Sequence, residues 1–101
     1  MSSEQEDKSY WDFVDRVIAE ANAATEELEP GLVSAALLQA AARYNAFVVA
    51  ASSIDRKEYI EEMEPAMQYL SSRYREYLHN NLDDYRENYK VYVRADQPDE
   101  E

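Results

Sequence analysis

The stretch that decides the fold is Gly31-Leu-Val-Ser-Ala-Ala-Leu-Leu-Gln-Ala-Ala-Ala-Arg-Tyr-Asn-Ala-Phe-Val-Val-Ala-Ala-Ser-Ser53. Sixteen of its 23 residues are apolar, eight of them are alanine, and Arg43 carries its one charge. Since alanine has the highest helix propensity, the stretch predicts a helix about 34 Å long. A helix that is apolar over most of its circumference has to be covered by other helices. The stretch is therefore expected to form the central helix of a small all-α domain.

Amphipathic helices are predicted on both sides of this segment. In the segment before it, apolar side chains recur at steps of three or four after Ser9. Asp12 lies three residues after Ser9, which is the spacing of a helix cap. After it, Asp55 and Glu58 repeat the capping pattern. We therefore expect an all-α bundle of three long helices, at about 9–28, 31–53 and 55–80, with a short fourth helix at 81–93.

Three sites predict interruptions between or within these helices. Glu29-Pro30-Gly31 predicts a type II turn, in which the glycine takes a positive φ. Pro65 predicts a kink or the start of a new helix, because an interior proline loses a backbone hydrogen bond. His79-Asn80-Asn81 predicts a last break, with His79 near a helix C-terminus. The apolar stripe keeps its phase across this third site, so one long bent helix over 55–93 is the alternative.

The ends and the charge of the chain limit its location and partners. Residues 1–8 and 94–101 predict disordered acidic tails around a single domain at 9–93. A net charge of −12 disfavours binding to nucleic acid or to anionic lipid. Gln39, Arg43 and Asn45 lie in the middle of the apolar stretch and argue against a membrane span. With no cysteine and no signal peptide, we expect a cytoplasmic protein.

A search for catalytic and metal-binding motifs finds none. His79 is the single histidine, and the Glu-x-x-His motif of di-iron helical bundles does not occur. One glycine in the whole chain leaves no phosphate-binding loop. We therefore expect no enzyme activity, no cofactor and no metal site.

Arg43, Tyr44 and Asn45 are the candidate ligand-binding residues. Arg43 is expected either at a solvent edge or half-buried with a carboxylate partner, for which Asp12, Asp15 or Glu64 are available. The functional alternative is an inter-helix pocket in which these three residues bind a small molecule or an anion.

The nine tyrosines of the chain are its most unusual feature. Six lie in the last third, interleaved with arginines, and such residues either fill the edge of a core or form a protein interface. The candidate interface is the helical stripe of Leu82, Tyr85, Tyr89 and Tyr92. An apolar stripe that three short helices leave uncovered predicts a homodimer, or an interaction with another, unidentified protein.

Several segments together resemble a known family. They are Tyr10-Trp11-Asp12-Phe13, Pro30-Gly31 with Val33-Ser34-Ala35-Ala36-Leu37-Leu38, Ala41-Ala42-Arg43-Tyr44-Asn45-Ala46-Phe47, and Asn81-Leu82-Asp83-Asp84-Tyr85 with Asn88-Tyr89. In this order and spacing they are similar to a small family of uncharacterised bacterial proteins, a domain of unknown function. The resemblance implies a helical fold and no particular activity. We expect a non-enzymatic interaction or regulatory module that self-associates.

Overall fold

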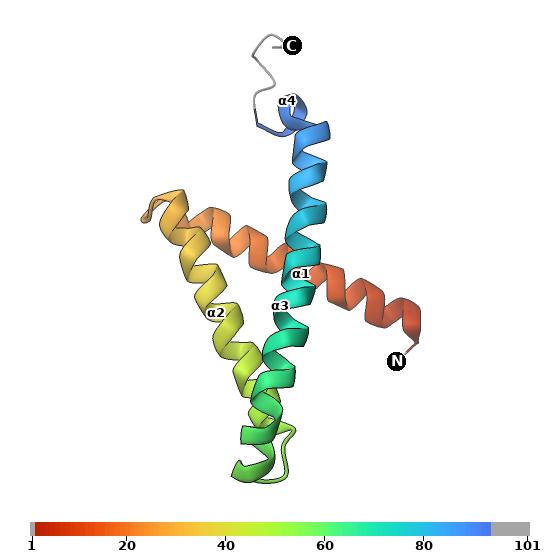
Figure 1. Cartoon of the computed structure of the whole chain (residues 1–101). Coiled ribbons are helices and arrows are strands. Elements are labelled where there is room, and N and C mark those ends of the chain that lie inside the picture. Colours follow the sequence, from red (N-terminus) through yellow and green to blue (C-terminus); the bar gives the residue numbers. More distant parts are fainter. Residues whose placement is uncertain (1, 94–101) are drawn as a thin grey trace. The chain divides into compact units, whose positions relative to one another are not determined.

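The computed structural model describes residues 2–93, of which 87% are helical and none lies in a strand. The chain contains α1 (Ser3–Ala24), α2 (Pro30–Ala51), α3 (Arg56–Glu87) and the single-turn α4 (Tyr89–Tyr92) (Figure 1). The predicted all-α class, with three long helices and a short fourth, is confirmed. The chain falls into two compact units, Met1–Val48 and Val49–Glu101. The packing of the long helices into one bundle, and the single domain over 9–93, stay predictions.

The first helix begins earlier than the sequence pattern indicated. Ser2, not Ser9, is its N-cap: the Ser2 hydroxyl accepts a hydrogen bond from the Gln5 N–H, and the Gln5 side chain accepts one from the Ser2 N–H, both at 3.2 Å. This reciprocal pair satisfies two backbone donors and extends the helix by two turns. Residues 3–8, expected in a disordered tail, therefore belong to α1, whereas residues 94–101 lie outside the described part of the chain.

The predicted type II turn at Glu29-Pro30-Gly31 is wrong. Pro30 is the first residue of α2, Gly31 is the second, and no glycine has a positive φ. Proline suits the first helical position because its φ is already helical and its missing N–H would have no partner there. The chain reverses instead through residues 25–29, where the Leu28 N–H bonds the Ala24 carbonyl at 3.0 Å.

Gly31 offers the first testable prediction. It is helical, its φ is negative, and a Cβ added to it would meet no atom within 4 Å. Gly31→Ala should therefore stabilise the protein by about 0.4–1 kcal/mol, mainly by restricting the unfolded chain. Chemical denaturation of both proteins measures the difference, and a loss of stability would show that this position needs glycine.

The third long helix is continuous through both predicted interruptions. Its start agrees with the sequence, since the Asp55 side chain accepts from the Glu58 N–H at 2.9 Å. Pro65 lies inside α3, and the Asn81 side chain donates to the Tyr77 carbonyl at 2.8 Å instead of capping a helix end. The break falls at Asn88, so the fourth helix spans four residues where we expected 81–93.

Candidate functional site

The three candidate ligand-binding residues do not converge. Successive residues of a helix point about 100° apart, so Arg43 and Asn45 lie on nearly opposite sides of α2. Arg43 and Tyr44 are exposed and Asn45 is partly covered. Within residues 2–93, no ion pair involves Arg43, and Asp12 pairs with Lys8 at 2.8 Å instead. Of the two environments expected for Arg43, the solvent edge is the one observed.

Exposure of Arg43 sets the expected effect of removing it. Arg43→Ala should change the free energy of unfolding by no more than about 0.5 kcal/mol, because no buried carboxylate would lose its partner. A buried pair would instead cost about 3–5 kcal/mol when one member is removed. Urea denaturation of the variant separates the two cases, and a cost in the higher range would contradict an exposed Arg43.

Tyr44 packs against an aromatic neighbour on its own helix. The Tyr44 and Phe47 ring centroids are 5.8 Å apart, and the planes are tilted by 42°. Both side chains remain largely accessible, at 64% and 59% of their maximum. This aromatic pair lies in the one long helix that carries no acidic residue. Residues three apart lie on the same side of a helix, and the contact agrees with that spacing.

The candidate interface residues fall on two helices. Leu82 and Tyr85 are in α3, whereas Tyr89 and Tyr92 form the ends of α4. The Tyr85 and Tyr92 rings are in contact, with centroids 4.8 Å apart, and the Tyr92 hydroxyl donates to Asp84 at 3.2 Å. All four apolar side chains are still about half exposed. The stripe is therefore partly closed on itself by the fold-back of α4.

The hydrogen bond to Asp84 raises the pKa of the Tyr92 hydroxyl above the usual 10.0, because the carboxylate accepts a hydrogen bond from the neutral phenol and repels a phenolate. The contact therefore holds α4 to α3 below pH 10 and is lost as the pH rises through the raised pKa. Subtracting the phenolate absorbance titration of Tyr92→Phe from that of the wild type should reveal this late-titrating tyrosine. Asp84→Asn should return its pKa toward 10.0, and an unchanged titration would contradict the contact.

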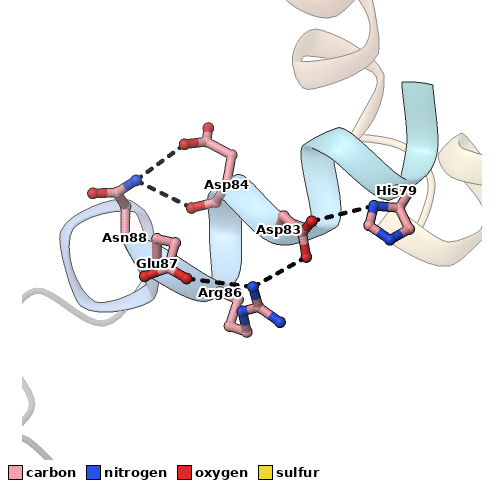
Figure 2. A network of polar contacts seen from close by, with 6 residues as sticks. All are labelled: His79, Asp83, Asp84, Arg86, Glu87 and Asn88. Carbon is pink, nitrogen blue, oxygen red and sulfur yellow. Dashed lines mark hydrogen bonds and ion pairs between the residues drawn. The ribbon is translucent and has the colours of Figure 1, made fainter. Parts of the chain in front are cut away.

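A network of polar contacts lies along the C-terminal part of α3 (Figure 2). Asp83 pairs with His79 Nδ1 at 3.2 Å and with Arg86 at 3.4 Å, while the Asn88 amide donates to the Asp84 side chain at 3.0 Å. His79 and Arg86 are more than two-thirds exposed, as expected of polar contacts between residues three or four apart on a helix surface. His79 lies two turns before the end of α3, so the predicted position at a helix C-terminus is wrong.

No catalytic or metal-binding arrangement emerges from these contacts. Among residues 2–93, no three histidine or acidic side chains gather as metal ligands would. The one arginine–tyrosine contact of note, Arg73 to the Tyr77 hydroxyl at 2.8 Å, lies on the exposed surface of α3. The absence of enzyme activity and of a cofactor stays a prediction.

Sequence reasoning missed a second exposed aromatic group, in α1. The Tyr10 and Trp11 rings meet edge to face at 5.1 Å, and Arg16 lies over the Phe13 ring at 5.4 Å. All three aromatic side chains are more than half exposed. The signal was present, because three aromatics within four consecutive residues cannot all face one side of a helix.

Many large apolar side chains in the described part of the chain are exposed, among them Trp11, Phe47 and Ile54. Val33, with 7% of its surface accessible, is the only apolar residue in the described chain that is buried. By length and composition α2 also qualifies as a membrane span, a test that core helices of water-soluble proteins pass as well. That the chain does not enter a membrane stays a prediction.

These features define a small all-helical protein whose apolar side chains lie mainly at its surface. The chain belongs to the family described as "Protein of unknown function (DUF3144)", whose family model matches residues 10–86. The resemblance to a family of unknown function is thereby confirmed, and a bacterial origin stays a prediction. A search of curated proteins gave no match, and a search of solved structures gave none either.

Proposed function

We propose that this protein is a non-enzymatic interaction module that works as a homodimer in the cytoplasm. The observation that supports it is the exposure of many large apolar side chains in the described part of the chain, where Val33 is the one apolar residue that is buried. Large exposed apolar patches are rare on soluble monomers and are typical of association sites. A regulatory role would act through this association.

The ligand-binding alternative receives no comparable support. It requires Arg43 and Asn45 to face one pocket, and they lie on nearly opposite sides of α2. Self-association is therefore the function that we put forward.

Light scattering on the full chain tests this proposal. A dimer should give twice the chain mass of 11.8 kDa at micromolar concentration and should keep that mass in high salt, since apolar contacts are not screened. A mass of 11.8 kDa at every concentration tested would remove the basis of the proposed function.

A further inference from the structure

The fold-back of α4 brings two tyrosine rings together. The Tyr85 and Tyr92 centroids are 4.8 Å apart, and within residues 2–93 no other pair of tyrosine rings is in contact. Both residues belong to the same compact unit of the chain, Val49–Glu101. Tyr85 is 49% exposed and Tyr92 is 50% exposed, so a reagent in solution can reach both rings.

The hydroxyl of Tyr92 has a base beside it. Its O–H donates to one carboxylate oxygen of Asp84 at 3.2 Å. The Asn88 amide donates to the other oxygen at 3.0 Å and holds the carboxylate in place (Figure 2). Within the described chain, Tyr92 is the one tyrosine whose hydroxyl donates to a carboxylate, whereas the Tyr77 hydroxyl accepts from Arg73. A phenol that loses an electron also loses its proton, so a carboxylate in this position favours one-electron oxidation of Tyr92.

The composition of the chain directs oxidation to its aromatic and methionine side chains. The chain has no cysteine, whose thiolate would otherwise react readily with oxidants. It has nine tyrosines, one tryptophan and three methionines. A methionine takes up an oxygen atom and forms no bond to a second side chain. Two tyrosine rings in contact are therefore the place where oxidation can cross-link this chain within itself.

We propose that Tyr85 and Tyr92 form an oxidative cross-linking site, at which a peroxidase and hydrogen peroxide join the two rings as dityrosine. The peroxidase takes one electron from each ring. The phenolic proton of Tyr92 passes to Asp84, and that of Tyr85 passes to water. A carbon–carbon bond then forms between ring carbons adjacent to the two C–O carbons, and the hydrogen on each bonded carbon returns to the phenol oxygen. The electrons and the released protons reduce the peroxide, so one peroxide and two tyrosines give one dityrosine and two water molecules.

The cross-link fixes α4 on α3. Without it, the single-turn α4 is held by exposed contacts, which open locally at low cost. The new bond makes the fold-back permanent, so the position of α4 records that the chain has been oxidised. The site does not depend on the proposed self-association, because both rings belong to one chain.

Peptide mapping of the oxidised full chain tests the site. Equal amounts of isotopically labelled and unlabelled chain are mixed, treated with a haem peroxidase and hydrogen peroxide, and digested with trypsin. Cleavage after arginine and lysine leaves Tyr85 in the peptide 76–86 and Tyr92 in the peptide 91–94. We expect the main dityrosine product to join these two peptides. Both peptides should carry the same label, because one chain supplies them.

Conservative variants assign the two rings. Tyr92→Phe removes one phenol and should abolish this product together with most of the dityrosine fluorescence. Tyr89→Phe is the matched control, because Tyr89 is 51% exposed but has no ring contact, and it should leave the product unchanged. Tyr77→Phe should also leave it unchanged, since Tyr77 is the other tyrosine of the peptide 76–86.

Three further variants test the part of Asp84. Asp84→Asn removes the base and should lower the initial rate of cross-linking at least about threefold at neutral pH. Asp84→Glu keeps a carboxylate and should retain most of the rate. Asp83→Asn makes the same charge change at a residue that contacts His79 and Arg86, and it should leave the rate unchanged.

The outcomes that would overturn this inference are specific. A main product that carries mixed labels, or that joins other peptides, overturns the site. An undiminished dityrosine yield in Tyr92→Phe does the same. Equal rates in Asp84→Asn and the wild type overturn the role of Asp84 as proton acceptor. None of these outcomes is a measurement of the native mass, so they are distinguishable from a failure of the proposed self-association.

Discussion

Replacing Pro65 with alanine is expected to raise the free energy of unfolding by about 1–3 kcal/mol. Pro65 is the tenth residue of a helix that continues without a break to Glu87. Its nitrogen cannot donate to the carbonyl four residues earlier, and its ring crowds that carbonyl. Alanine restores the donor, removes the crowding and has the best helix propensity.

Equilibrium unfolding in urea, followed by helical circular dichroism, measures this gain. Glu64→Ala is the matched control, because it changes the neighbouring exposed residue without altering the backbone and should stay within about 0.5 kcal/mol of the wild type. If Pro65→Ala lowered stability instead, the proline would be needed for a bend that packing exploits, and the sequence-based expectation of a kink would regain support.

A hundredfold dilution of the protein should lower its thermal midpoint by about 5–10 °C. Unfolding that is coupled to dissociation depends on concentration, because each native dimer yields two unfolded chains. The dimer is expected to unfold in this way because a single chain buries one apolar residue in its described part. Scanning calorimetry or circular dichroism over the dilution series measures the shift. A wild-type midpoint that is independent of concentration would mean that the chain folds alone.

The sequence was sufficient to predict the helical class and the number of long helices. Alanine density and apolar steps of three or four decide helix formation locally, and the Asp55–Glu58 cap formed where the spacing indicated. The first and last residues of each helix were harder to predict, because more than one nearby residue could serve as the helix cap. Ser2 with Gln5 makes a reciprocal cap that Ser9 with Asp12 does not make, and Asp12 instead pairs with Lys8.

The errors within helices have a common physical reason. Considered alone, Pro65 and Asn81 are residue types that often end a helix. A 32-residue helix has many other backbone hydrogen bonds, so it tolerates the one donor that Pro65 lacks. Asn81 stays within the helix because its side chain donates to the carbonyl four residues earlier. Pro30 was interpreted as a stop, although the same fixed φ favours a first helical position. A single residue such as proline therefore predicts a helix end or a helix start, depending on whether the helix lies before or after it in the sequence.

The candidate site was the least predictable part. Arg43 stands out because it is the only charge in its stretch, but neighbours in sequence point in different directions on a helix, so adjacency to Tyr44 and Asn45 makes no pocket. The Tyr85–Tyr92 contact needed the α4 fold-back at Asn88, which no helical periodicity predicts. The exposure of each aromatic side chain becomes visible only from coordinates.

The central claim is that a second copy completes this fold, and helix content measured along the dissociation curve tests it most directly. Sedimentation gives the fraction of dimer at each dilution, and circular dichroism gives the helical signal of the same samples. We expect the helical signal to fall as the dimer dissociates, because the freed chains lack a sufficient core. Chains of 11.8 kDa that keep the full helical signal and unfold cooperatively would contradict the claim.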